Sequence, residues 1–572
     1  MTTRQRLQAL EARLLAAISG PRLMDYNRMT AAGIRLSGNA DERQVFADIQ
    51  QEMARLGYRT RLLEHPGYVS WPDESSITVE GSGEEIGPSI PHAMAASTPP
   101  EGLAAEAVYV GASAPAGYRQ VDVRGRVAIL EGLAMPETVA LAEAQGCVAV
   151  VAVSDEYLHQ MIVSTVWGNP TPETEPRLPQ IPVVSVPAPA GARLRALLAQ
   201  GPLRLRLHAQ VETGWKMLPL LVADLPAPWP TPRYVLLSGH VDSWWHGAMD
   251  NGGANATMVE VANVLAQERA HWQRGLRLAF WSGHSHGRYA GSTWYADHCW
   301  ADLEQNAVVH INVDGTGAHG ADNFTTAPCM AETRRMATDL IKELTGQDYA
   351  GHRMSRAGDQ SFWGVGMPSL FMNVSSQPDG SAGWWWHTEH DTMEQIAEAN
   401  LVRDTQAYAL AVARFVTRPV LPLDFVDVAD EFLAMLEGLQ AQAGAALDLG
   451  PALVQAAALR ARASALMNVA QAVGRSAASA ADPRAAAVNA CFMRLSRLLV
   501  PVSYSSADRF HQSPAVPIPP LPGLQAVAEL AALAPRSHPF RLLETRLVRE
   551  RNRVCHALAE ATAAIEETLR RL

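Results

Sequence analysis

Residues 233–257 read RYVLLSGHVDSWWHGAMDNGGANAT, and this stretch predicts both a type of fold and the place of a site within it. Its first part, RYVLLSGH, is largely apolar, as is typical of a strand in a sheet covered on both faces. His240 and Asp242 come at the end of that strand, and Asp250 comes just before a helix pattern. Ligand sites of doubly wound sheets lie at the carboxyl ends of the strands, so we expect these side chains to line a cleft.

Three further strand patterns, LRLAFWSG, AVVHINVDG and PSLFMNV, alternate with helix patterns within residues 216–420. The histidines and aspartates that follow these strands or lie in the last loop are His284, His286, Asp314, His387 and Asp391. A lone aspartate at a strand end is more often a helix cap or turn former, and a lone histidine is usually a surface or core residue. Several of them in one domain instead indicate a shared cleft. Histidine and carboxylate ligands without cysteine suit zinc, with manganese, cobalt or iron as alternatives.

The composition of the whole chain narrows its class. Its 572 residues predict several domains, and a net charge of −11 with a pI near 5.9 argues against nucleic acid or an anionic membrane as a partner. We find neither a secretory signal pattern at the N-terminus nor an uncharged apolar run of about 18 residues, so no membrane span is expected. The five cysteines are scattered without CxxC spacing, which favours reduced thiols in a cytoplasmic protein.

Changes in the pattern of predicted strands and helices along the chain divide it into four parts. Together they predict an α/β protein with a doubly wound mixed sheet. Residues 1–80 hold N-terminal helices and the first part of the catalytic domain, and residues 81–212 alternate strands and helices as a compact α/β insert. Residues 213–420 form the catalytic domain. Residues 421–572 are helical, and their alanine and leucine stripes predict packing or dimerisation surfaces, so we expect a homodimer.

The order of the motifs GHVDS, GAMDNGG, NVDG and HTEHDT resembles the co-catalytic zinc aminopeptidase family, which also contains glutamate carboxypeptidase and the transferrin receptor. The segment GIRLSGNADERQVFADIQQEMARLGY resembles the N-terminal helix of that family. The runs VRGRVAIL, AEAQGCVAVVAVSDE and IPVVSV resemble the protease-associated insert of its larger members. The resemblance covers residues 25–420 well. The rest of the chain resembles the family only in its helical pattern.

Position by position, the resemblance implies a set of metal ligands. His240, Asp250 and Asp314 would hold one metal, and Asp250 would bridge to a second metal that His387 also holds. Asp242 would orient the His240 imidazole. In the family the metals polarise the scissile carbonyl and lower the pKa of a bound water. The resemblance therefore implies a metallopeptidase that uses one or two divalent ions, with zinc expected.

One segment departs from the family. Where the family has two adjacent glutamates, a general base and then a metal ligand, this chain reads WSGHSHG. Counting from Gly287 places His284 at the base position and Ser285 at the ligand position, and a serine hydroxyl is a poor ligand. An extra residue follows in GRYAGS, so His286 is the candidate for the missing ligand. Gln360 also replaces a histidine that is common in the family.

Three outcomes are open for this segment. In the first, His284 is the catalytic base or positions the water, and His286 binds the second metal. In the second, the site keeps one metal. In the third, catalysis is lost and the protein is a scaffold or binding protein. Intact ligands elsewhere favour an enzyme over a scaffold, and a mononuclear iron enzyme of redox type is a further rival.

The substrate is indicated only by aromatic residues near the motifs, which are Trp244, Trp245, Trp281, Trp363, Trp384, Trp385 and Trp386. Tryptophan at such positions is often plain packing, but rings that line the cleft would favour an apolar or aromatic group. The sequence therefore predicts a metal-dependent hydrolase, aminopeptidase-like or amidohydrolase-like, that cleaves a small peptide or a small-molecule amide.

Overall fold

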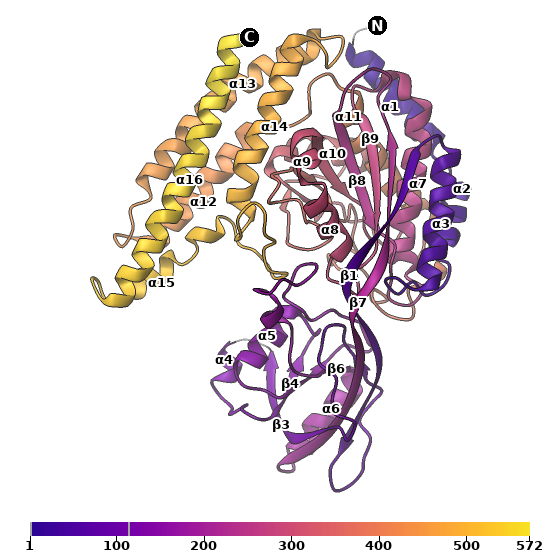
Figure 1. The fold of residues 1–572 in the computed structure, drawn as a ribbon, viewed down its shortest axis with the longest axis vertical. Helices are drawn as coiled ribbons and strands as arrows, with labels where there is room; N and C mark the ends of the chain where they lie inside the picture. Colours follow the sequence, from indigo (N-terminus) through magenta and orange to yellow (C-terminus); the bar gives the residue numbers. More distant parts are fainter. Residues whose placement is uncertain (1–2, 113–114) are drawn as a thin grey trace.

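A mixed sheet forms the centre of the largest lobe of the computed structural model, which describes residues 3–112 and 115–572 (Figure 1). Its central strands run parallel, in the order β13, β10, β8 and β9. They are β8 (Tyr234–His240), β9 (Gly275–Trp281), β10 (Ala307–Asn312) and β13 (Ser369–Leu370). The first three have the apolar runs that the sequence predicts, and their residues are almost all buried.

Helices cover both faces of this sheet, which explains why its strands are apolar throughout. One face packs against α2 (Gly20–Thr30), α3 (Ala40–Arg55), α7 (Ala254–Gln267), α10 (Ala331–Thr345) and α11 (Glu398–Thr417). The other face packs against α8 (Ala290–His298) and α9 (Trp300–Asn306). The α/β class with a doubly wound mixed sheet, predicted from the sequence, is confirmed.

The strand predicted for PSLFMNV is much shorter than its apolar run. Only Ser369 and Leu370 have strand pairing. Phe371 has a φ of 59°, and this left-handed backbone conformation ends the extended segment. The residues that follow form a loop, and Met372 and Asn373 line the cavity described below.

The N-terminal helices begin with α1 (Thr3–Ala17), and α3 has the helical face that the sequence predicts. Val45, Ile49 and Met53 are buried in the main core. Asn39 caps α3 by accepting a hydrogen bond from the backbone N–H of Glu42. These helices pack on α7 and α11, so this segment is part of the catalytic lobe.

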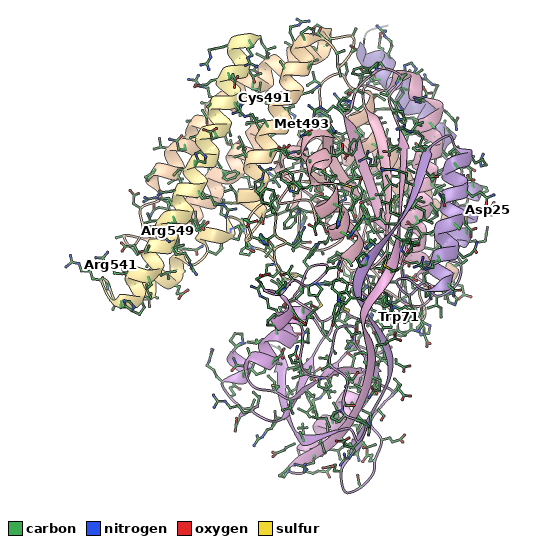
Figure 2. All side chains as sticks on the ribbon, viewed as in Figure 1. Asp25, Trp71, Cys491, Met493, Arg541 and Arg549 are labelled. Carbon is green, nitrogen blue, oxygen red and sulfur yellow. The ribbon has the colours of Figure 1, made fainter. Side chains whose placement is uncertain are left out.

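Two long strands connect the catalytic lobe to a second lobe, which is the lower one in Figure 1. The strands β1 (Arg59–Val79) and β7 (Leu203–Leu225) pair antiparallel along almost their whole length. One end of β7 pairs with β9 in the catalytic sheet, and its other end pairs with β3 (Leu103–Ala112) in the second lobe. Trp71 of β1 lies where the lobes meet (Figure 2). Strand β7 is thus continuous through the predicted boundary at residues 212–213.

The second lobe has the alternation of strands and helices predicted for residues 81–212. Strands β3, β4, β5 and β6 are parallel neighbours. The lobe contains β2 (Ile90–Pro91), β4 (Val127–Glu131), β5 (Ala149–Val153), β6 (Val183–Val186), α4 (Pro115–Tyr118), α5 (Pro136–Ala144) and α6 (Ala188–Leu198). We refer to this lobe as the insert.

The C-terminal part is helical, as predicted, and packs beside the catalytic lobe (Figure 1). Its helices are α12 (Phe425–Ala443), α13 (Gly450–Ser476), α14 (Pro483–Tyr504), α15 (Val527–Ala532) and α16 (His538–Arg571). Helix α14 is long and apolar enough to cross a membrane, but it packs against α16 and is largely buried. The alanine and leucine stripes contact one another within this domain. The homodimer stays a prediction.

Candidate metal centre

The ends of β8 and β10 bring three predicted ligands to one point. His240 ends β8, Asp314 follows β10, and Asp250 lies on a distorted turn before α7. The His240 Nε2 atom lies 3.1 Å from Asp250 Oδ1 and 3.6 Å from Asp314 Oδ1. The other oxygen of Asp250, Oδ2, lies 3.2 Å from His387 Nε2. Asp250 therefore stands between the two imidazoles, which is the place that a bridging carboxylate takes.

Backbone carbonyls hold both imidazoles in one orientation. His240 Nδ1 donates to the carbonyl of Asp242 at 2.8 Å, and His387 Nδ1 donates to the carbonyl of Gln160 at 2.7 Å. A carbonyl oxygen only accepts hydrogen bonds, so Nδ1 carries the proton in each ring. When the rings are neutral, the lone pair of each is on Nε2 and points at a carboxylate oxygen. Burial lowers the pKa of His240, but Asp242, Asp250 and Asp314 outweigh it and raise this pKa well above its usual value, so Nε2 lies where a cation is favoured.

This arrangement fits a divalent metal ion. A lone pair that faces a carboxylate is repulsive unless a cation lies between them. His240 Nε2 and Asp250 Oδ1 are buried and have no hydrogen-bond partner among the described residues. Ligand atoms about 2.0–2.1 Å from a tetrahedral zinc ion are about 3.3 Å apart, close to the separations found here. His240, Asp250, Asp314 and His387 are thus the residues that would hold the metal.

His284 lies beside this cluster. Its ring stacks on the ring of His240 with centroids 3.7 Å apart. Ligand atoms of His240, His284 and Asp314 lie within 4.8 Å of one another. His284 Nδ1 donates to Asp359 Oδ2 at 2.8 Å, so its Nε2 is also free to accept a proton or to bind an ion. Of the two histidines in the altered segment, His284 is the one that reaches the cluster.

His286 is directed elsewhere. Its ring is fully buried, contacts Trp244 with centroids 4.3 Å apart, and lies with Nδ1 2.9 Å from Ser37 Oγ. Burial lowers the pKa of His286 despite the neighbouring Asp242, so the ring is neutral. It is not part of the group of ligand atoms formed by the described residues around His240. Its role as a ligand stays a prediction that this geometry does not favour.

Asp242 holds the altered segment more directly than it holds His240. Its Oδ2 accepts from the backbone N–H of Ser285 at 2.8 Å and from Ser37 Oγ at 2.7 Å. The bond to His240 comes from the backbone carbonyl of Asp242, whereas the carboxylate is 3.6 Å from His240 Nδ1. Burial opposes ionisation, but the neighbouring imidazoles of His240 and His286 hold the pKa of Asp242 well below its usual range. Asp242 thus positions both motifs.

Comparison with known proteins identifies the domain that carries this cluster. Residues 221–413 match the model of Peptidase family M28. This segment is a family M28 domain. Its span contains every predicted ligand, and β8, β9 and β10, which position the ligands.

Related proteins extend the match beyond the M28 domain. "Probable glutamate carboxypeptidase VP8" of Zea mays is 24% identical over 491 residues, which are 70% of this chain and 67% of that protein. Carboxypeptidase Q of Xenopus laevis is 26% identical over 341 residues, or 56% of this chain and 67% of that protein. Among solved structures, a zinc aminopeptidase from Bacillus subtilis has a TM-score of 0.54 at 19% identity and covers 70% of this chain and 96% of its own. That last likeness shows the fold.

These findings confirm two expectations from the sequence. The chain contains the domain of a co-catalytic zinc metallopeptidase family, and it is a metal-dependent hydrolase. The donor set of the cluster agrees with a divalent metal.

A cavity of about 450 Å³ opens onto the cluster of the M28 domain. All three lobes line it, because the insert contributes Met161 and Ile162 and the loop before α15 contributes Val516. Trp244, Trp386 and Tyr289 also line it, with several methionines. Of the predicted aromatic residues, Trp281 and Trp363 are buried in the core instead. The cavity thus has apolar and aromatic walls around the candidate metal ligands.

Sequence reasoning missed two supports of the M28 site, Asp359 and Gln160, and the contacts of a third, Asp391. Asp359 orients His284, and it stands directly before Gln360, which the sequence singled out. Gln160 contributes only a backbone carbonyl, which no side-chain motif can reveal. The turn of Asp250 is held by Asp391, which accepts from the backbone N–H groups of residues 249 and 250. The sequence singled out Asp391 as a polar residue of the last loop, but its contacts with the turn of Asp250 could not be predicted.

Proposed function

We propose that the protein hydrolyses an amide bond of a small peptide or amide that carries an apolar or aromatic group. The proposal rests on one observation above all. The Nε2 atoms of His240 and His387 point at the two oxygens of Asp250, at the edge of a cavity with aromatic walls. A divalent ion bound there would polarise the scissile carbonyl and acidify a water.

The residues of this chain support the proton transfers of such a reaction. His284 Nε2 can accept the proton of the attacking water, because Nδ1 already donates to Asp359. The carboxylate of Asp359 would stabilise the resulting imidazolium, and the same proton would pass to the leaving amine. Trp244 and Trp386 supply apolar walls for the group beside the scissile bond.

The unequal sides of the centre support a proposal for the number of ions. We propose one ion bound by His240, Asp250 and Asp314, and a second, weaker one between Asp250 and His387. Zinc is our proposal for both, with manganese, cobalt or iron as alternatives. Free cysteines support our proposal of a cytoplasmic protein.

Metal analysis tests this function directly. We expect protein purified without chelator to contain about one equivalent of a divalent metal, rising toward two in excess metal. Removing the metal should abolish hydrolysis of a panel of N-acyl and dipeptide amides, and zinc should restore it. Wild-type hydrolysis by metal-free protein would contradict the proposal.

A matched pair of variants controls that test. His387→Ala should lower metal content at the weaker site and reduce turnover. His390→Ala, which removes a half-exposed ring from the same loop, should change neither. If both variants behave alike, the loop and not the imidazole of His387 is responsible.

A second candidate function has one specific observation in its favour. Two imidazoles and one carboxylate close together, as in His240, His284 and Asp314, are also the donors of mononuclear iron oxygenases. Asp250 is a second carboxylate beside His240, whereas such a site has one carboxylate, and this difference favours hydrolysis. Stoichiometric iron with oxygen consumption, and no amide hydrolysis, would favour the oxygenase.

A further inference from the structure

A buried arginine lies beside the loop that joins His240 to the turn of Asp250. Arg35, in the segment GIRLSG before α3, is fully buried. Its guanidinium contacts residues 241–247, which form this loop. A buried cation is costly unless polar groups compensate for the water that it loses, so the contacts of Arg35 must offset that cost.

The guanidinium of Arg35 donates to both ends of the loop. Its Nε donates to the carbonyl of Val241 at 2.8 Å, directly after His240. Its Nη1 and Nη2 donate to the carbonyls of residues 246 and 247 at 2.7 and 3.0 Å, directly before the turn that carries Asp250. Because the guanidinium is rigid and planar, these bonds fix the separation of the two ends of the loop.

Further contacts join the same two segments. The backbone N–H of Ser243 donates to the carbonyl of Arg35 at 2.8 Å, and Ser37 Oγ donates to Asp242 Oδ2 at 2.7 Å. At the end of the loop, Gly247 has a φ of 49°, and a Cβ atom there would collide with the carbonyl oxygen of Asp250. The end of the loop therefore packs directly on the turn of Asp250, so a shift of one displaces the other.

The charge of Arg35 does not explain its position. Burial lowers its pKa to about 10, and four nearby carboxylates act to raise it, those of Asp391, Asp242, Glu42 and Asp250. The side chain is thus a cation at neutral pH. A cation near the centre repels a metal ion, so charge alone would weaken metal binding. What favours the ion is the geometry that the hydrogen bonds impose.

We propose that Arg35 is a positioning residue that holds His240 and Asp250 at the separation that a divalent ion requires, before the ion binds. This inference rests on the proposed metal centre and adds a residue outside the cavity, because Arg35 does not line it. His240 Nε2 and Asp250 Oδ1 are already 3.1 Å apart. Without the bonds of Arg35 the loop would be freer, and ion binding would have to offset the entropy of ordering it.

Arg35→Lys tests the geometry with the charge held constant. Lysine keeps the positive charge but lacks the planar fork that reaches three carbonyls. We expect the zinc affinity of the stronger site to fall about 10- to 100-fold, measured by competition with a chelator. The visible absorption spectrum of the cobalt-substituted protein should also change, because it depends on the arrangement of the ligands. Neither measurement requires turnover.

A second buried arginine provides a matched control. Arg274 is 2% exposed and donates to the carbonyls of Phe415, Arg418 and Pro419 at 2.7, 2.8 and 2.9 Å. It stands directly before β9, at the edge of the sheet opposite to the strand ends that carry the candidate ligands. Arg274→Lys should lower the free energy of unfolding about as much as Arg35→Lys does. It should keep zinc affinity within about 2-fold of wild type and leave the cobalt spectrum unchanged.

The outcomes separate positioning from stability. The proposal is overturned if Arg35→Lys binds zinc as wild type does, or if Arg274→Lys weakens binding equally. Arg35→Gln is used if Arg35→Lys does not fold, and failure of both to fold would assign Arg35 to the stability of the lobe and overturn the proposal as well.

The same measurements distinguish this proposal from the proposed function. A wild-type protein that binds no divalent ion would overturn both. Weaker zinc binding in Arg35→Lys, with no amide hydrolysed by wild type, would support the positioning role and contradict the proposed hydrolysis alone.

Discussion

The two sides of the candidate metal centre are built differently. On one side, His240 faces two carboxylates, Asp250 and Asp314, and the ring of His284 stacks on it. On the other side, His387 faces Asp250 alone, and the altered segment places Ser285 and not a carboxylate in the cavity. The comparison shows that an altered loop can remove a potential ligand from one side of a centre while residues at strand ends keep the ligands of the other side.

The largest effect should come from the stronger side. His240→Ala removes the ligand that both carboxylates face, so we expect loss of the tightly bound ion and a fall in kcat/KM on the order of 1,000-fold or more. Elemental analysis and steady-state kinetics measure the two effects. His246→Ala, an exposed neighbour, is the control and should behave as wild type. Full metal content in His240→Ala would remove this residue from the centre.

The altered segment gives the sharpest comparison, because two histidines lie two residues apart. His284→Ala should lower kcat by about 100-fold with the first ion retained, as expected for loss of a proton acceptor. His286→Ala should leave metal content and kcat within about 2-fold of wild type, because its ring faces Ser37 and Trp244. The sequence alone, which makes His286 a ligand of the second ion, predicts lower occupancy of that ion in His286→Ala. That result would show that the loop rearranges when metal binds.

Substitution of Asp359, the hydrogen-bond partner of His284, should have a smaller effect on kcat. Asp359→Asn keeps the shape of the side chain but removes the charge that orients the imidazole. We expect a loss of about 10- to 100-fold in kcat with KM nearly unchanged. Asp379→Asn, an exposed aspartate, serves as the control. A KM effect without a kcat effect would mean that Asp359 shapes the cavity and does not tune His284.

The free energy of unfolding should fall at acid pH because of two buried histidines, one in the insert and one in the catalytic sheet. Burial lowers the pKa of His92 in the insert and of His310 in β10 to about 3. Both are neutral when folded, so unfolding takes up protons below about pH 6.5, and stability falls as pH drops from there toward 3. The loss should approach about 1.4 kcal/mol per pH unit for each histidine. Denaturant titrations of His310→Gln should show a shallower pH dependence than those of wild type.

The sequence predicted the parts of this site that depend on strand periodicity. An apolar run followed by histidine or aspartate locates His240 and Asp314, because strand ends of one sheet meet at one edge. The sequence could not show whether His284 or His286 reaches the candidate metal ligands, because that depends on how the loop turns after β9. The left-handed backbone of Arg288 and Tyr289, which belongs to that turn, has no signature in residue type.

Other parts were beyond sequence reasoning because they join distant segments. Gln160 meets His387 across 227 positions of the chain, and it does so through its backbone. Asp359 meets His284 across 75 positions. Among the described residues, Arg356 donates hydrogen bonds to neutral oxygens and to no carboxylate, and this too appears only once its surroundings are known. Contacts of this kind depend on the packing of three lobes and not on any local pattern.

The paired strands β1 and β7 give the molecule a mechanical property. They span 21 and 23 residues and cross the junction as one hydrogen-bonded ladder, which resists bending far more than a single-chain linker does. Tilting the insert therefore loads the ladder elastically, and the load reaches His387 through the carbonyl of Gln160. The ladder and the backbone hydrogen bonds of Gln160 thus tie the orientation of the insert to the position of His387.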